Sequence, residues 1–351
     1  MADMKGARRH AGRNAALIAA AVVIAAALIA GLLLRRGSST TVQTTTHPAT
    51  SAHVTTPAAP PPPPPRPTAF AVGLRTITVV DPRRVIRLPD GATEARQFAV
   101  TVRYPARGPV GGAAVAGAPP ARTNGPFPLV VFGHGFDITP SSYARLLDVW
   151  ARAGYVVAAP TYPLENPDAP GGPDERDLVN QPADDSLVIT RMLSSSGGLP
   201  AALRGLADPT KVAVAGQSDG GDTALAVAYD PRYRDRRVRA AVILSGAEIP
   251  FIRSFRFPPG GPPLLATQGT ADVVNPAAAT RAFYLIAPDP KYLLTLFGAA
   301  HLPPYSYEEP QLGIVERTTT AFLNLYLAHG TLAALRAVGT VPGVSHLAVN
   351  G

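Results

Sequence analysis

Residues 211–229 read KVAVAGQSDGGDTALAVAY, and the fold of the whole chain can be worked out from this stretch. The apolar residues 212–215 predict a short buried strand, and the alanine-rich run at the end predicts a helix. Between them, Gly216 and Gly220 stand two residues before and two residues after Ser218. Glycine tolerates the sharp turn that joins a strand directly to a helix. We therefore expect the serine hydroxyl to project at the carboxyl edge of a sheet, beside the N-terminus of the helix.

The pattern G-x-S-x-G between a strand and a helix is typical of a nucleophile elbow. An ordinary strand-to-helix turn is the alternative, because glycine and serine are common in turns. A serine nucleophile needs a base, an acid that orients the base, and hydrogen-bond donors for the oxyanion. Each of these can be sought elsewhere in the chain.

Four histidines lie beyond residue 68: His134, His301, His329 and His346. His301 directly follows the predicted strand Tyr292–Phe297, so we expect it at the same sheet edge as the serine and predict that it is the base. His329 ends the last predicted helix, where a structural role near the helix dipole suffices. His346 lies in a tail without a predicted strand.

Asp272 follows another predicted strand, Pro263–Gln268, and is our candidate for the acid. It could instead cap the helix that begins at Pro276, although four residues is a poor distance for a cap. Glu248, three residues beyond the preceding strand, is a competing candidate. With Asp272, the chain order of the three groups is serine, aspartate, histidine.

The sequence FGHGF at residues 132–136 ends the predicted strand Pro128–Phe132. Its glycines allow a backbone to approach a substrate closely. We predict an oxyanion hole made by the backbone N–H groups of Phe136 and Asp219. His134 is expected to brace this loop by hydrogen bonding.

Beyond residue 127 the chain alternates between continuous apolar strands and amphipathic helices, which predicts a parallel sheet covered on both faces. Shorter alternating segments before it (Val72–Val80, Arg84–Leu88 and Gln97–Tyr104) predict antiparallel strands at one sheet edge. The expected class is α/β, with a mostly parallel, doubly wound sheet and an antiparallel entrance. Only about sixteen residues, 246–261, separate two predicted strands, which is too few for a large cap domain. We expect an open cleft partly walled by Phe251, Phe255 and Phe257.

Most of the net charge of +8 lies near the N-terminus. Residues 1–68 carry seven basic residues and one acidic residue, which leaves 25 basic and 23 acidic residues beyond them. The predicted folded part is thus nearly neutral and lacks the basic patch of a nucleic-acid-binding protein. The chain has no cysteine, so disulfides, thiolate metal sites and a cysteine nucleophile are all excluded.

An uncharged apolar run of twenty residues, 15–34, follows a basic tail at residues 1–14 and is closed by Arg35 and Arg36. Such a run is long enough to span a bilayer and longer than the apolar core of most cleaved signal peptides. The excess of basic residues before it places the N-terminus inside. We predict a transmembrane signal anchor with the catalytic domain outside the cytoplasm; secretion after cleavage of a signal peptide is the alternative.

Residues 35–68 are rich in Ser, Thr and Pro and predict a disordered stalk. If fully extended, it would reach on the order of 100 Å at about 3.1 Å per residue. The catalytic domain is then expected at residues 69–351. Within it, five carboxylates in residues 165–177 could bind Ca²⁺, but no ordered ligand spacing is present and a solvated loop is the preferred interpretation. We expect no cofactor and no metal.

Taken together, residues 127–305 resemble the α/β-hydrolases grouped around dienelactone hydrolase, platelet-activating-factor acetylhydrolase and the polyester hydrolases. The matching pieces are FGHGF, ARAGYVVAAPTYP, GQSDGG, GTADVVNP and GAAHLPPY. The polyester hydrolases usually carry Met after the serine and a Trp after the next strand, whereas this chain has Asp219 and Gly246-Ala247-Glu248. Dienelactone hydrolases proper use a cysteine nucleophile, which this chain lacks. The acetylhydrolases take their acid from the earlier strand, which keeps Glu248 as an alternative.

This resemblance implies a serine carboxylesterase that cleaves a small-molecule or lipid ester through an acyl-enzyme. Ser218 would be the nucleophile, His301 the base and Asp272 the acid. Amidase, peptidase or polyester hydrolase activity on the same fold is an alternative, as is an inactive, envelope-anchored binding protein.

Overall fold

The computed structural model describes residues 69–195, 198–247 and 257–350. The predicted basic tail, membrane span and stalk lie outside these ranges, as does Glu248. Among the described helices, none is both long enough and apolar enough to cross a membrane.

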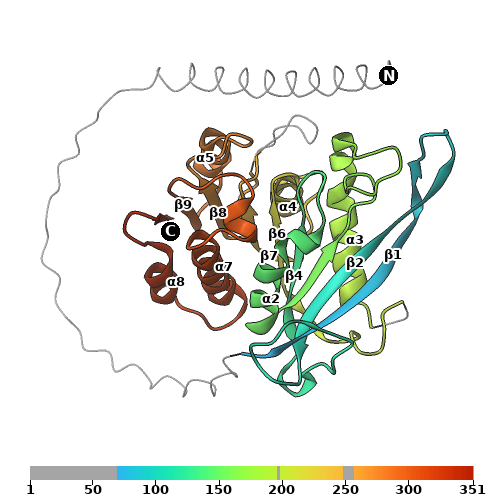
Figure 1. The fold of residues 1–351 in the computed structure, drawn as a ribbon, viewed down its shortest axis with the longest axis horizontal. Coiled ribbons are helices and arrows are strands. Elements are labelled where there is room, and N and C mark those ends of the chain that lie inside the picture. The colour runs from blue at the N-terminus through green and yellow to red at the C-terminus, as the bar shows by residue number, and fades with distance from the viewer. Residues whose placement is uncertain (1–68, 196–197, 248–256, 351) are drawn as a thin grey trace, which may run out of the picture. The chain divides into compact units, whose positions relative to one another are not determined.

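The described residues form an α/β fold around one mixed sheet of ten strands, in the order β10-β9-β8-β7-β6-β4-β5-β2-β1-β3 (Figure 1). Strands β4 to β9 pair in parallel, as do β1 and the short β3, whereas β1 with β2, β2 with β5 and β9 with β10 pair antiparallel. The strands are β1 (Ala71–Arg87), β2 (Thr93–Ala106), β3 (Val115–Ala116), β4 (Phe127–Gly133), β5 (Val156–Pro160), β6 (Ala207–Gln217), β7 (Val238–Leu244), β8 (Leu264–Gly269), β9 (Lys291–Leu296) and β10 (Ser345–Asn350).

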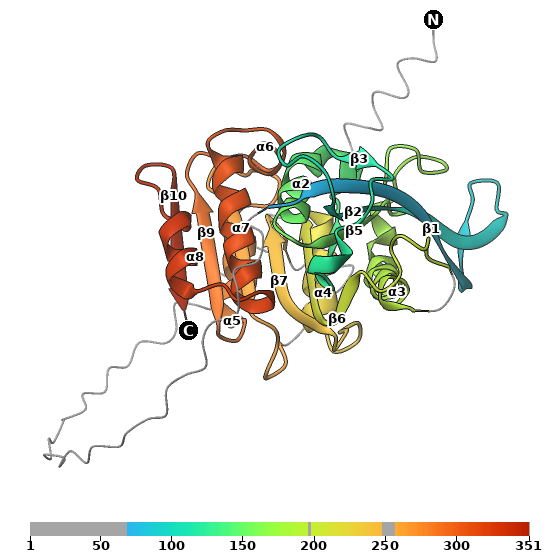
Figure 2. The same cartoon turned by 90° about the horizontal axis from the view of Figure 1, so that it is seen from below.

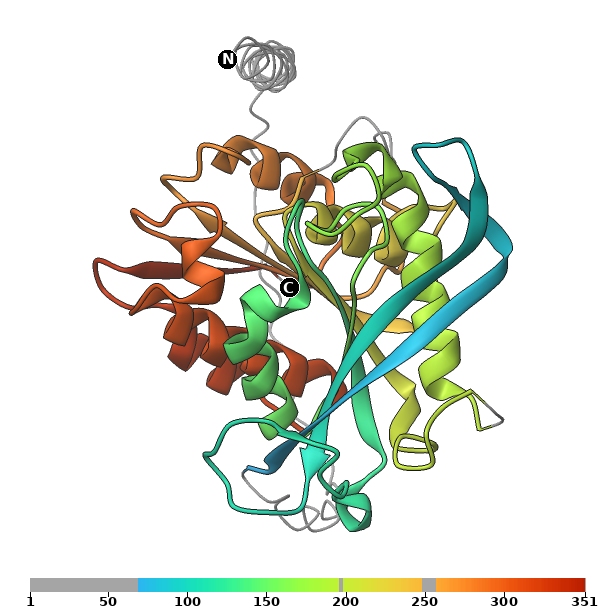
Figure 3. The same ribbon diagram turned by 45° about the vertical axis from the view of Figure 1, so that its right-hand side comes forward.

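Helices cover both faces of this sheet, as Figure 3 shows. One core holds side chains of α3, α4 and α5, and a second core on the other face holds side chains of α2, α7 and α8. The central strands are apolar along their whole length because both of their faces are covered; every residue of β4, for example, is buried. The helices are α2 (Ala144–Arg152), α3 (Gln181–Leu193), α4 (Asp219–Tyr229), α5 (Ala277–Ile286), α6 (Pro303–Ser306), α7 (Gln311–Leu327) and α8 (Leu332–Gly339), with short 3₁₀ turns η1 (Arg122–Asn124), η2 (Pro140–Tyr143) and η3 (Glu175–Asn180).

The N-terminal strands form one long hairpin that curves past the end of the sheet (Figure 2). The predicted strands Val72–Val80 and Arg84–Leu88 are parts of one strand, β1, which is interrupted by an irregularity between Asp81 and Val85 where the register with β2 shifts. Antiparallel pairing of β1 with β2 and of β2 with β5 agrees with the prediction of an antiparallel sheet edge.

The C-terminal segment differs from the prediction. The sequence predicts a tail without a strand around His346, but this residue lies in β10, opposite Thr295 of β9. A six-residue segment with two buried positions, Ser345 and Leu347, has too weak a pattern to be recognised alone. Its strand conformation depends on the unpaired edge that β9 offers.

Candidate active site

Ser218 stands between β6 and α4 in a backbone conformation that other residues rarely adopt, with φ of 56° and ψ of −126°. For any residue other than glycine this backbone conformation is strained, and it persists only where contacts with surrounding residues stabilise it. Its N–H donates to the carbonyl of Leu244 at 3.0 Å, and its own carbonyl accepts from the N–H of Asp222 at 3.0 Å. The serine is thus fixed between strand β7 and the first turn of α4.

The glycines around Ser218 are needed because backbones cross at contact distance. A Cβ on Gly216 would lie 2.0 Å from the carbonyl oxygen of Gly220. A Cβ on Gly220 would lie 2.2 Å from the carbonyl of Gly133, at the end of β4. Strands β4 and β6 and helix α4 can therefore meet closely only if these three positions are glycine.

The structure brings Ser218, His301 and Asp272 together at the carboxyl edge of the sheet. The Nε2 atom of His301 lies 2.9 Å from the Oγ atom of Ser218, and its Nδ1 atom lies 2.8 Å from Oδ2 of Asp272. A carboxylate can only accept a hydrogen bond, so Nδ1 carries a proton and donates a hydrogen bond to Asp272. The Nε2 atom of a neutral ring is then free to accept the serine hydroxyl proton.

Asp272 is held by the backbone that follows it. Its Oδ1 atom accepts from the N–H groups of Val274 and Asn275, both at 2.9 Å. Burial would raise the pKa of this carboxyl, but the hydrogen bonds from His301 and from the two N–H groups outweigh it, and the pKa lies below its usual value. The acid is therefore ionised and oriented toward the imidazole.

The loop after β4 passes directly beside the serine. A Cβ on Gly135 would lie 3.1 Å from the Cβ of Ser218, which shows how near this backbone runs. Asp219 is the first residue of α4, so its N–H belongs to the donors that a helix leaves without an intrahelical acceptor. Both predicted oxyanion donors, Phe136 and Asp219, thus belong to segments that border Ser218.

His134 braces the loop, as its sequence context predicted. The fully buried ring accepts the N–H of Tyr162 on Nε2 at 3.0 Å and donates from Nδ1 to the carbonyl of Gly135 at 2.8 Å. Burial lowers the pKa of His134 to about 4, so the ring is neutral and suited to one donating and one accepting nitrogen.

Gln217, which the sequence did not single out, links three parts of the site. Its Oε1 accepts the hydroxyl of Tyr143 at 2.6 Å, and that hydroxyl in turn accepts the N–H of Gly135 at 3.3 Å. Its Nε2 donates to the carbonyl of His301 at 3.1 Å. The side chain therefore connects the glycine loop to the histidine loop. Only its place beside Ser218 in the elbow motif could have drawn attention to it.

Two buried carboxyl groups beside the serine were also missed as partners. Asp219 follows Ser218, and Glu165 lies in the loop after β5; their exposed fractions are 7% and 0%. Burial raises the pKa of Asp219 to about 6 and raises that of Glu165 well above its usual value. The sequence showed both residues but could not show that they meet.

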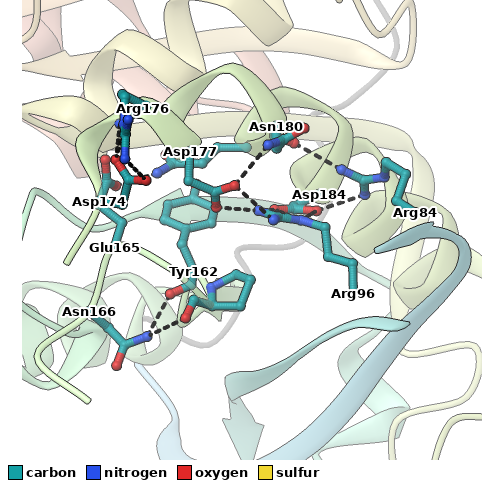
Figure 4. A network of polar contacts seen from close by, with 12 residues as sticks. Arg84, Arg96, Tyr162, Glu165, Asn166, Asp174, Arg176, Asp177, Asn180 and Asp184 are labelled. Carbon is teal, nitrogen blue, oxygen red and sulfur yellow. Dashed lines mark hydrogen bonds and ion pairs between the residues drawn. The ribbon is translucent and has the colours of Figure 1, made fainter. Parts of the chain in front are cut away.

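The acidic segment 165–177 is only in part the predicted solvated loop, because Asp168 is exposed whereas Glu165 and Asp177 are buried. Arg96, itself buried, forms hydrogen bonds to Asp177 at 2.7 and 2.9 Å and to Asp184 at 2.8 Å, as Figure 4 shows. Arg84 adds a bond to Asp184 at 2.7 Å. The carboxylates of this region thus tie η3 and α3 to the hairpin β1–β2. Within the described ranges, no group of three or more His, Cys, Asp or Glu side chains could hold a metal ion.

The prediction that Phe257 walls the cleft is wrong. Its ring packs against Tyr229 with centroids 4.8 Å apart, at the end of α4 that is remote from Ser218. Helix α4 has 11 residues, and at 1.5 Å per residue the two ends are about 15 Å apart. Phe251 and Phe255 lie outside the described residues.

A cavity of about 450 Å³ lies away from this site, between the hairpin and α3. It is lined by Asp81, Arg84, Ser186 and Tyr233 among others, and none of the three residues that meet at the sheet edge borders it.

Comparison with known proteins gave two informative matches. The family model named Chlorophyllase matches residues 91–243, which include Ser218. Among solved structures, a ferulic acid esterase from Streptomyces cinnamoneus is similar, with 22% identity, a TM-score of 0.58, and coverage of 78% of this chain and 94% of that chain. No curated protein matches. The structural likeness shows the α/β-hydrolase fold, and the two matches together support a carboxylesterase-like hydrolase.

Proposed function

We propose that this α/β-hydrolase is a serine carboxylesterase that works through an acyl-enzyme, with its catalytic domain on the outer side of the membrane. One observation carries the proposal: a single imidazole, His301, lies 2.9 Å from the hydroxyl of Ser218 and 2.8 Å from the carboxylate of Asp272. This chain of contacts matches the order of proton transfer that nucleophilic serine catalysis requires.

In the proposed first half-reaction, the Oγ of Ser218 attacks the ester carbonyl carbon while its proton passes to Nε2 of His301. The negative charge that develops on the carbonyl oxygen is stabilised by the backbone N–H groups of Phe136 and Asp219. Asp272 stabilises the imidazolium and holds the ring in place. The tetrahedral intermediate then expels the alcohol, which takes the proton from His301 and leaves the acyl group on the serine.

In the second half-reaction, water replaces the alcohol. His301 accepts a proton from the water as its oxygen attacks the acyl carbonyl, and the same oxyanion donors stabilise the second tetrahedral intermediate. Collapse of this intermediate releases the carboxylic acid and returns the proton to Ser218. No cofactor takes part in any of these steps.

The substrate class is an ester of small or lipid size. The family match and the structural likeness to a ferulic acid esterase support a carboxylic ester as the first choice for assay. Asp219 stands where the polyester hydrolases usually carry Met, which argues against a polymer substrate.

The proposal is tested by comparing kcat of the full-length wild type and of the Ser218→Ala variant on p-nitrophenyl esters of increasing acyl length. Loss of one triad group reduces kcat by about 10⁴- to 10⁶-fold. Undiminished hydrolysis by the S218A variant would contradict the assignment. A matched control is Ser186→Ala, since Ser186 lies on α3 beside the remote cavity.

The proposed location rests on the apolar run at residues 15–34. Cell fractionation followed by an alkaline wash should leave the full-length protein in the membrane pellet. Recovery of a shortened chain from the culture medium would instead favour a cleaved signal peptide.

A further inference from the structure

Glu165 and Asp219 form a pair of buried carboxyl groups next to the serine. Each has one buried oxygen without a hydrogen-bond donor: Oε1 of Glu165 and Oδ2 of Asp219. Each carboxyl group shifts the pKa of the other, so the two side chains lie close together. Two ionised carboxylates have no proton with which to form a hydrogen bond. If one of the two groups is protonated, its O–H donates to the other, and both buried oxygens take part in a hydrogen bond.

The surrounding amide determines which oxygen of Glu165 faces Asp219. The Oγ1 of Thr223 donates to Oε1 of Gln181 at 2.7 Å, so the NH₂ group of Gln181 points the other way. That NH₂ group donates to Oε2 of Glu165. Oε2 is therefore the carbonyl-like oxygen of a protonated carboxyl, and Oε1 is left to carry the proton toward Asp219.

Glu165 also contacts both sides of the proposed oxyanion hole. Its backbone carbonyl accepts the N–H of Asp137 at 3.0 Å, next to Phe136. Its side chain meets Asp219, whose N–H is the second proposed donor. One residue thus connects the loop after β4 to the N-terminus of α4.

We propose that Glu165 is a positioning residue, which shares one proton with Asp219 and thereby holds the oxyanion donors of Phe136 and Asp219 at their working distance. Ionisation of the pair places two like charges in a buried site and separates the loop from the helix. This inference rests on the proposed function, and it adds a loss of activity, dependent on Glu165, as the pH rises through the folded pKa of the pair.

Several titratable groups surround the pair of Glu165 and Asp219. Asp177 and Tyr162 interact electrostatically with Glu165, whereas Glu175, His301 and Tyr143 interact electrostatically with Asp219. Burial and the charge of Asp219 raise the pKa of Glu165, and Gln181 offsets only part of this increase. Because the proton is bound more tightly in the folded state, the pair stabilises the fold at low pH, and this contribution is lost as the pH rises through the folded pKa.

Amide substitutions test the shared proton directly. In Glu165→Gln, the new NH₂ group can donate to Asp219 at every pH while the new carbonyl still accepts from Gln181. In Glu165→Leu no donor remains and Asp219 is left unpaired. Misplacement of a catalytic group by about 1 Å can cost 10²-fold in rate. We expect E165L to lose about 10- to 100-fold in kcat with KM nearly unchanged.

E165Q should recover most of the kcat that E165L loses. The loss of kcat at rising pH that the wild type shows should disappear in E165Q or move to higher pH. Asp219→Asn, which also supplies a permanent donor, should move this loss in the same direction. Glu316→Gln is the matched control, because Glu316 is a buried carboxyl with a raised pKa on α7 that pairs with Arg145. Its pH profile should match that of the wild type.

Two further measurements on the full-length protein do not depend on turnover. Thermal unfolding of the wild type should show a loss of stability as the pH rises from the unfolded carboxyl pKa, about 4, through the folded pKa of the pair, and E165Q should lack this loss. The infrared spectrum should show a protonated carboxyl band that E165Q removes. An active wild type whose E165Q variant keeps the same loss at rising pH, in both kcat and unfolding, would overturn the shared proton. An E165L variant with wild-type kcat, or one in which only KM changes, would overturn the positioning role of Glu165. A wild type that hydrolyses no ester contradicts the proposed function instead.

Discussion

Replacement of Asp272 by asparagine tests whether this carboxylate sets the state of the imidazole. Its Oδ1 atom accepts two backbone N–H groups, from Val274 and Asn275, and only an oxygen can do so. The asparagine carbonyl must therefore occupy this position, which places its NH₂ group where Oδ2 now lies, 2.8 Å from Nδ1 of His301.

An NH₂ group at that place reverses the roles of the two ring nitrogens. Nδ1 would become the acceptor, and Nε2 would carry the proton and could no longer accept one from Ser218. In serine proteases the equivalent change lowers kcat by about 10⁴-fold, which corresponds to about 5 kcal/mol at 1.36 kcal/mol per decade. Because both backbone hydrogen bonds remain, the free energy of unfolding should change by less than about 1 kcal/mol.

The assay is single-turnover and steady-state hydrolysis of a p-nitrophenyl ester by the wild type and by D272N. Urea unfolding of both proteins serves as the control for folding. If kcat of D272N stays within tenfold of the wild type, the reasoning is refuted, and Glu248 becomes the acid to test by E248Q.

Two other substitutions examine the surroundings of the site. Gln217→Leu removes the donor to the carbonyl of His301. Since one hydrogen bond contributes about 1 kcal/mol, kcat should fall about five- to tenfold without loss of folding. An unchanged kcat would exclude a positioning role for Gln217. Arg96→Met leaves the buried carboxylates of Asp177 and Asp184 without their shared partner, and breaking such a pair costs about 3–5 kcal/mol in urea unfolding. A loss of less than 1 kcal/mol would show that this network does not hold the hairpin to α3.

Much of the fold could be predicted because its determinants are local. Glycines spaced around Ser218 mark a close crossing of backbones, and continuous apolar segments mark strands covered on both faces. Three polar groups that each follow a strand had to meet at one sheet edge once the strands were parallel, which is why Asp272 and His301 could be named in advance.

What could not be predicted depends on partners distant in sequence. The strand that contains His346 needs the free edge of β9. The burial of Asp177 could not be predicted because Arg96, which binds it, lies 81 residues away in the chain. The meeting of Glu165 and Asp219 likewise depends on how the loop after β5 packs against α4, and neither residue stands in a pattern that indicates it.

The proposed chemistry requires a covalent bond to one particular oxygen. Intact-protein mass spectrometry after treatment with a fluorophosphonate, followed by peptide mapping, measures that bond. We predict a single adduct on Ser218 in the wild type, none in S218A, and strongly slowed labelling in His301→Ala. Labelling of S218A to the same extent, or an adduct mapped to another residue, would contradict the assignment of Ser218 as the nucleophile.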